Sequence, residues 1–315
     1  MTSVKFLRSF QLKVTGRSGV ELFINYPLTL TFDITNHIFS AANSAQFSLY
    51  NLSERNRSEI LVDAQLKKIG GFPVTLNAGY QTQYPQAGAQ LAAISKTSTP
   101  LPTIFNGFVN VAYTERNGPD LITRIDAMDL GDVATSDPSA VFPSAFRVAR
   151  GTSFVDKVKS MMRLLKGVQV GAVIVTPVQP ATTRDETYSG RVWDYLQSIA
   201  AHVGGNVFVE NGVCNMLGQN DVVPGLNNLG ELTSDTGLLN IPRYTGHTVT
   251  CSSVFEPALA IGKTIGLKSQ YAGAPNGMYK IIQYSHRGTI SGSVSGDAVS
   301  DITLVSLPSP VTPTL

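Results

Sequence analysis

Apolar and polar residues alternate with a period of two along most of this chain of 315 residues. The longest alternating runs are Val4–Gly16, Val20–Asn36, Phe72–Tyr80 and Thr103–Arg116. Such alternation is typical of β-strands that bury one face and turn the other to water. Asn117-Gly118 lies between two such runs, and this dipeptide predicts a tight β-hairpin. The sequence therefore predicts a β-rich fold, with about six strands before residue 132.

The period changes abruptly at one corner, in the stretch NSAQFSLYNLSERNRSEIL between Asn43 and Leu61. Residues up to Tyr50 alternate as a strand does. Ser53 then predicts the start of a helix, because its hydroxyl can accept a hydrogen bond from a free backbone N–H. The helix is expected to end near Lys67-Lys68, ahead of two glycines. The predicted unit is a strand, a tight corner and a short helix that lies on a sheet.

Helical periods return between residues 150 and 218. Thr152 or Ser153 can cap a first helix, and a second helix places Trp193 on its apolar stripe, where a core position is favoured over a ligand platform. Asn211-Gly212 predicts another hairpin. This segment is expected to form a small α/β layer, and strands follow it.

The predicted fold class is β-rich α+β, with two β-barrel or β-sandwich domains and a small α/β domain between them. The expected boundaries are 1–135 for the first β-domain with one flanking helix, 136–235 for the α/β domain and linker, 236–308 for the second β-domain, and 309–315 for a flexible tail. Residues 81–102 lack a clean period. They fit either a functional, partner-ordered loop or an extended hairpin.

Charge argues against several classes of protein. Charged residues make up only 15% of the chain, below the roughly 25% usual for soluble domains, which fits a surface largely covered by neighbours. The net charge of +2 gives no footprint for specific nucleic-acid or membrane binding.

The sequence has no apolar run long enough to span a bilayer and no apolar signal segment at its start. Synthesis in a cytoplasm is therefore expected.

The residues that most often carry chemistry are scattered along the sequence. None of the four histidines, His37, His202, His247 and His286, has a second ligand at metal-binding spacing. Cys214 and Cys251 stand alone and are expected to be reduced core residues, although the sequence does not say whether they meet.

Two carboxylate pairs and the usual catalytic motifs were also considered. Asp126 and Asp129 are expected at a solvated sheet edge, and Asp185 and Glu186 are expected to be exposed ahead of the second helix. The nucleophile elbow, the phosphate loop and the dinucleotide fingerprint are absent from the sequence. The sequence thus assigns no catalytic, cofactor-binding or metal residue, predicts no cofactor, and favours a protein that is not an enzyme.

Several motifs, taken in order, resemble the hub proteins of phage tail baseplates. They are FDITN, NSAQFSLYNLSERNRSEI, VTLNAGY, IFNGFVNVAYTERNGPDLITRIDAMD, GLLNIPRYTGHTVTCSSVFEPALAIGKTIGLKS and GMYKIIQYSHRG. The resemblance spans about residues 20 to 305, and the order of the motifs is more specific than any one of them. Residues 81–102 look like an insertion relative to the compact form of the family.

The resemblance implies a structural virion protein of the tail baseplate. Such hubs are trimers in which each chain carries two domains with the tail-tube fold, so that three copies imitate a ring of six. The implied partners are the tail tube protein or distal tail ring, the central spike, the tape-measure protein, and wedge or sheath-side components. DNA would pass through the lumen without specific binding, along a neutral or acidic wall.

Two other classes stay open at this stage. One is a tail-associated cell-wall hydrolase, which would need a carboxylate pair or metal set in the middle domain. The other is a carbohydrate-binding module, which would favour exposed aromatic residues.

Overall fold

The computed structural model describes residues 7–39, 43–61, 72–81, 100–129, 141–143, 146–223, 229–271 and 273–307. Strands dominate these residues, and three helices of α type accompany them. The predicted helix end near Lys67, most of residues 81–102 and the tail 309–315 lie outside the described residues.

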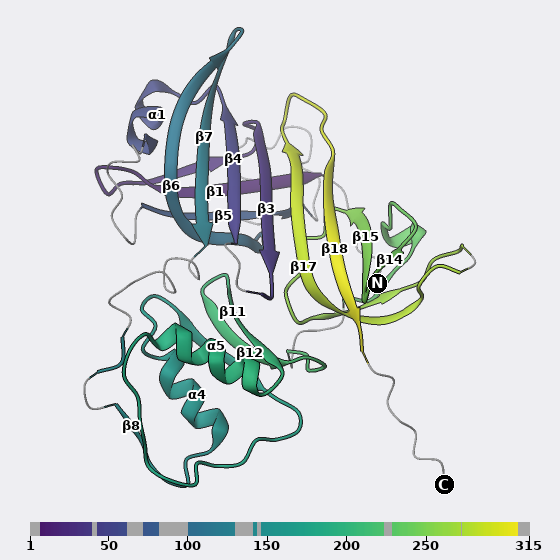
Figure 1. Cartoon of the computed structure of the whole chain (residues 1–315). Helices are drawn as coiled ribbons and strands as arrows, with labels where there is room; N and C mark the ends of the chain where they lie inside the picture. The colour runs from purple at the N-terminus through teal and green to yellow at the C-terminus, as the bar shows by residue number, and fades with distance from the viewer. Residues whose placement is uncertain are drawn as a thin grey trace.

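The described residues of the first half form seven strands and one short helix. Their bounds are β1 (Arg8–Thr15), β2 (Glu21–Asn25), β3 (Leu30–His37), β4 (Ser44–Tyr50), α1 (Glu54–Ile60), β5 (Phe72–Tyr80), β6 (Thr103–Asn117) and β7 (Asp120–Asp129). Asn117 pairs with Asp120 across the turn between β6 and β7, and Gly118 has a φ of +60° there. The hairpin predicted at Asn117-Gly118 is thus confirmed, and it extends past its neighbours in the sheet (Figure 1).

The corner between β4 and α1 is built by two polar side chains. Asn51 adopts a φ of 54°, and its side chain accepts a hydrogen bond from Leu121 N at 3.0 Å and donates one to Asp120 at 2.8 Å. Ser53 caps α1 by accepting from Asn56 N, as the sequence predicted. A left-handed asparagine and a serine cap therefore turn the chain from strand to helix.

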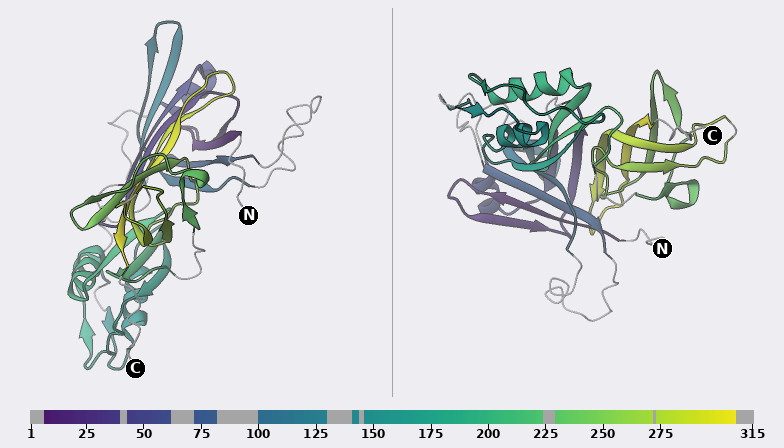
Figure 2. Two further views of the ribbon diagram at one scale, coloured as in Figure 1. Left: turned by 90° about the vertical axis from the view of Figure 1, so that its right-hand side faces the viewer. Right: turned by 90° about the horizontal axis from the view of Figure 1, so that it is seen from below.

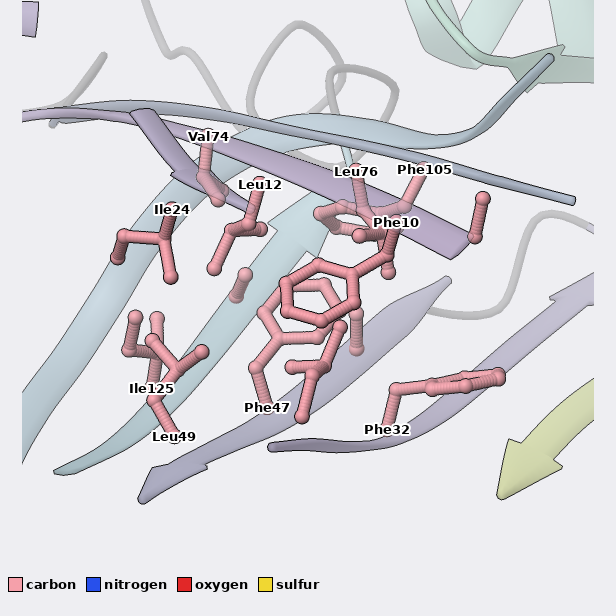
Figure 3. Packing of buried hydrophobic residues seen from close by; sticks show 14 of the residues in the cluster. Phe10, Leu12, Ile24, Phe32, Phe47, Leu49, Val74, Leu76, Phe105 and Ile125 are labelled. Carbon is pink, nitrogen blue, oxygen red and sulfur yellow. The ribbon is translucent and has the colours of Figure 1, made fainter. Parts of the chain in front are cut away.

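The core of the first half lies between two layers of strands. Strands β1 and β5 cross behind β3, β4 and β7 (Figure 1), and their apolar side chains point toward one another (Figure 3). Phe47 of β4 meets Phe105 of β6 edge to face, with ring centroids 5.6 Å apart. Because every second residue of these strands is apolar, each layer supplies one continuous apolar face.

The middle of the chain forms the α/β insert. Its elements are β8 (Arg147–Val148), α4 (Phe154–Met162), β9 (Gln169–Ile174), β10 (Glu186–Thr187), α5 (Val192–His202), β11 (Gly205–Glu210) and β12 (Val213–Gly218). Ser153 caps α4, and Asn211 and Gly212 turn the β11–β12 hairpin with φ values of 49° and 82°, as predicted. Trp193 is buried in the core of the insert. The insert lies at one end of β3, β4, β6 and β7 in two perpendicular views (Figures 1 and 2).

The second half is again made of strands. Its elements are β13 (Glu231–Leu232), the 3₁₀ turn η2 (Ser234–Thr236), β14 (Arg243–Thr245), β15 (Thr248–Val254), β16 (Thr264–Leu267), β17 (Gly277–Ile290) and β18 (Ala298–Ser306). Strand β13 comes from the predicted linker and pairs with β16 in parallel.

One sheet runs through both halves. Its strand order is β14-β15-β18-β17-β3-β4-β7-β6-β5-β1-β2, with β16 and β13 beside β17. The two halves join at β3 and β17, whose antiparallel ladder has eight residue pairs from Leu30–Ile290 to His37–Gln283. We call this ladder the seam. The β-rich α+β prediction is confirmed, whereas alternation along the sequence did not indicate that the halves share a sheet.

Candidate functional site

Polar side chains predominate on one side of the strands around the seam, with Val254, Val299, Val305 and Met128 among them. Strands β15, β18, β17, β3, β4 and β7 bury every second residue, and the residues between them face the other way. We call this surface the polar face. Its main members are Thr248, Thr250, Ser252, Asp301, Thr303, Gln283, Ser285, Arg287, Thr289, Thr31, Asp33, Thr35, Ser44, Gln46, Ser48, Arg124 and Asp126.

Hydroxyl groups line up in rows across the polar face. One row follows the register of five strands and contains Ser252, Asp301, Ser285, Thr35 and Ser44. Within it, Ser252 Oγ and Asp301 Oδ1 are 2.6 Å apart. Since the row starts in the second half and ends in the first, the polar face belongs to both halves at once.

The seam itself is bridged by hydroxyls on this face. Thr31 Oγ1 and Thr289 Oγ1 lie 3.2 Å apart, and Thr29 Oγ1 lies 2.6 Å from Ser291 Oγ. A hollow of about 520 Å³ opens beside them and is lined by residues that include Gln46. The same hollow is lined by two acidic and two basic side chains, Asp33, Asp297, Arg124 and Arg287, so the centre of the face carries hydroxyl groups together with charges of both signs.

The arginines of the polar face are paired with carboxylates. Arg287 lies 3.1 Å from Asp301, and Arg124 lies 2.6 Å from Glu115 on the neighbouring strand β6. The hydrogen bond that Arg124 donates to Glu115 raises the pKa of Arg124. With Asp33 and Asp126 also on this side, the positive charges are matched by at least as many negative ones. A surface of this kind has no basic stripe that would hold a phosphate backbone.

Asp129 corrects one expectation from the sequence. It was expected at a solvated sheet edge together with Asp126, but its side chain is buried. Strand β7 lies between β4 and β6, and Asn43 Nδ2 donates to Asp129 Oδ2 at 2.9 Å and to the Val209 carbonyl at 3.2 Å. The reason is tertiary, because the α/β insert covers this end of β7 through Val209.

The other carboxylate pair lies on the insert. Asp185 forms an exposed ion pair with Arg147 at 3.0 Å. Glu186 is partly covered and lies 2.6 Å from Lys157, whose hydrogen bond lowers the pKa of Glu186. Both carboxylates are therefore engaged by cations in the folded chain.

The four histidines do not come together. His286 is buried with Nδ1 2.8 Å from Ser300 Oγ, and burial lowers its pKa to about 3. His202 and His247 are exposed, at the end of α5 and at the β14–β15 turn, and His37 is half-buried in β3. Within the described part of the chain, no group of three or more His, Cys, Asp or Glu side chains is placed to hold a metal ion.

The two cysteines are free and buried in different clusters. Cys214 belongs to the core of the insert, and Cys251 belongs to the core of the second half. Burial raises the pKa of each thiol to about 12. The sequence-based expectation of reduced core cysteines is confirmed.

In the described part of the chain, no helix is both long enough and apolar enough to cross a membrane.

Solved structures of tail proteins share this fold. A tail protein from Neisseria meningitidis MC58 superposes with a TM-score of 0.57 at 11% identity, covering 94% of this chain and 96% of that one. The 43 kDa tail protein of prophage MuSo2 from Shewanella oneidensis gives 0.57 at 10% identity, with coverages of 94% and 96%. At these identities the likeness shows the fold alone.

A third neighbour comes from a secretion system. The Escherichia coli c3393 protein is described as a component of the type VI secretion system with structural similarity to the T4 tail proteins gp27 and gp5. It gives a TM-score of 0.50 at 12% identity, covering 90% of this chain and 75% of that one. No curated protein shows significant sequence similarity to the chain.

The family comparison is more specific than the structural one. The model of the family described as Baseplate hub gp41 matches residues 9–289, which include the first half, the insert and the second half as far as β17. The resemblance inferred from the motifs is thus confirmed, and the chain belongs to the Baseplate hub gp41 family.

Proposed function

We propose that three copies of this chain form the hub of a tail baseplate, join the sixfold tail tube to the threefold central spike, and line part of the DNA channel. Membership of a baseplate hub family supports the structural role and a place in the virion tail. The observation that carries the proposal further is the polar face, which crosses the seam without interruption. Two strand-rich halves in each of three chains supply six units to a ring.

The ends of the sheet support assembly from several copies. Within the described residues, β2 and β14 each pair with only one strand. Unpaired strand edges are templates for pairing with another chain. Phe23 on β2 is 54% exposed, and Tyr244 on β14 is 64% exposed. In the proposed trimer, the β14 edge of one copy meets the β2 edge of the next, so that the contact is head-to-tail and closes into a ring.

The polar face suits the wall of a channel. DNA must slide past such a wall, and phosphate binding grows with the number of unpaired lysines and arginines it meets. On the polar face, Arg287 and Arg124 have carboxylate partners, Asp33 and Asp297 also line the central hollow, and hydroxyl groups bridge the seam. We therefore assign the lumen to this face and propose that DNA passes without specific binding.

Hub-family membership also implies association with other baseplate or spike proteins. We propose the tail tube protein or distal tail ring on one side, the spike on the other, and the tape-measure protein and wedge or sheath-side components nearby. We further propose that the chain has no enzymatic activity and is made in the host cytoplasm.

Two measurements test the proposal together. Sedimentation of the purified chain should give a trimer, and a reconstruction of the intact tail tip should show three copies with the polar face toward the axis. One or six copies per tail, or a polar face turned outward, would contradict it. A monomer that clears peptidoglycan would support the tail-associated hydrolase instead.

A further inference from the structure

One carboxyl group joins the α/β insert to the second half. Glu210 is the last residue of β11 in the insert. Tyr284 of β17 donates its hydroxyl to Glu210 Oε1 at 2.7 Å, and the backbone N–H of Ile261 donates to the carboxylate at 3.1 Å. Ile261 lies in the loop between β15 and β16. The carboxyl group of the insert is therefore held by two elements of the second half.

Residues of the first half also lie beside Glu210 and Tyr284. Tyr284 is the register partner of Asn36 in the seam, and the hydroxyl-bearing ring is 1% exposed. Asn43 fastens the end of β7 to Val209, the residue before Glu210. The first half, the insert and the second half thus meet around one acidic side chain. We call this place the Glu210 junction.

The charged groups that face Glu210 come from each neighbouring element. Lys263 of the β15–β16 loop attracts its negative charge, and Asp129 at the end of β7 repels it. Lys263 Nζ donates to the Ala258 carbonyl at 2.7 Å, which fixes the amine within the same loop. Tyr284 has a pKa raised well above its usual value by burial, so its hydroxyl stays protonated.

The balance of these effects favours the neutral acid. Burial raises the pKa of Glu210 to about 7, although the hydrogen bonds from Tyr284 and Ile261 and the charge of Lys263 act in the opposite direction. Glu210 is half-buried by exposed area, and placing a charge in so largely covered a site costs more than two neutral hydrogen bonds return.

From this arrangement we propose that the Glu210 carboxyl group is a pH-sensitive latch: when it is protonated it holds the α/β insert against the sheet shared by both halves, and when it is ionised it loosens that attachment. The contacts of Glu210 are the reason, since they join the insert both to β17 and to the β15–β16 loop. A second titratable side chain, Lys280 of β17, donates to the carbonyls of Gly218 and Gln219 at the end of β12.

The direction of the pH effect follows from linkage. An opened junction exposes Glu210 to water, where its pKa returns to about 4.5, whereas the closed junction keeps it near 7. Between these values the open form loses its proton first, so opening becomes easier as pH rises. Above about pH 7 Glu210 is ionised in both forms and no longer changes the opening equilibrium. Lys280, whose pKa is lowered to about 8 by burial, acts only at higher pH and favours the closed form there.

Hydrogen exchange at the Ile261 amide measures the latch directly, because that N–H donates to Glu210. In the full chain, its protection factor should fall about tenfold per pH unit between about pH 5 and 7, and should stop falling near pH 7.5. Glu210→Gln should remove this dependence, whereas the exposed control Glu231→Gln should retain it. The same pH dependence in Glu210→Gln as in the wild type would overturn the proposal.

Two neighbouring substitutions test the latch without touching Glu210. Lys263→Met removes an attractive charge and should raise the pH at which the protection factor of the Ile261 amide stops falling. Asp129→Asn removes a repulsive charge and should lower that pH. Shifts in opposite directions support the latch, and two shifts of the same sign, or none, contradict it. This comparison stands even if Glu210→Gln fails to fold.

Discussion

Phe32 of β3 and Phe255, which follows β15, meet edge to face with ring centroids 5.7 Å apart and an angle of 62° between the rings. The two residues come from opposite halves of the chain, yet both are buried in the core of the first half. Tyr80 of β5 adds to the contact by donating its hydroxyl to the Phe255 carbonyl at 2.9 Å. The second half therefore completes the core of the first, in addition to extending its sheet.

Phe255→Ala should lower the free energy of unfolding by about 3–5 kcal/mol, because it empties a fully buried aromatic site. Both halves should still unfold in one transition, since they share the seam and this core. Urea unfolding followed by far-UV circular dichroism, together with near-UV signals from the aromatic core, would show this. Phe39→Ala, at a residue that is 63% exposed, is the matched control and should cost less than about 0.5 kcal/mol. Two separate transitions would show that the halves are independent.

Local features of the fold could be predicted because their causes are local. Ser53 and Ser153 cap helices by accepting from a backbone N–H three residues later, and Asn211-Gly212 turns a hairpin through two positive φ angles. Each of these signals is contained in a few neighbouring residues.

The arrangement in space could not be predicted in the same way. Alternation identifies β3 and β17 as strands, but it does not say that they pair, because a strand with one polar face fits many neighbours. Glu210 precedes Asn211-Gly212 and reads as a polar residue at a hairpin end. Its partial burial and its hydrogen bonds depend on Tyr284 and Ile261, which are distant in the sequence. The burial of Asp129 was missed for the same reason.

Ser153→Ala should lower the free energy of unfolding by about 1 kcal/mol, because Ser153 Oγ accepts from Asp156 N at 3.1 Å at the start of α4. Ser160→Ala lies in the same helix and is the matched control. Its hydroxyl donates to the Lys157 carbonyl, which already takes part in helix bonding, so a cost near zero is expected. Fluorescence of Trp193, which is buried in the insert, would follow unfolding in urea. An equal loss in the free energy of unfolding for the two variants would show that Ser153 does not stabilise α4 as a cap.

His286 should make the fold weaker in acid. Its pKa is lowered from 6.5 to about 3 by burial, so the unfolded chain takes up a proton at a pH where the folded chain does not. Stability is therefore lost as pH falls below 6.5, by about 1.4 kcal/mol per pH unit. Between about pH 7.5 and 5, the wild type should lose about 2 kcal/mol more than His286→Gln.

The effect of His286 is isolated by comparing how steeply the free energy of unfolding changes with pH in the wild type and in His286→Gln. Glu210 acts in the opposite direction over part of this range, but it does so equally in both proteins. The packing lost beside Phe255, whose ring lies 5.2 Å from His286, lowers the variant's stability at every pH and cancels in the slope. Parallel slopes for the two proteins would show that His286 ionises freely in the folded state.

Ser44→Lys combined with Gln46→Lys should slow DNA ejection if the polar face is the channel wall. Both residues are exposed on β4, and three copies would add six positive charges to the lumen. These charges would hold phosphates, so we expect ejection from assembled particles to slow by at least about threefold at low salt. The delay should shrink at high salt, because salt screens exposed charges.

Ser44→Asn with Gln46→Asn changes the same two positions without adding charge, and particles with this pair should eject DNA at the wild-type rate. Gln46→Glu should do the same, because an acidic wall repels DNA. Equal ejection rates for the lysine and asparagine pairs, in particles of normal yield, would place the channel wall on another face.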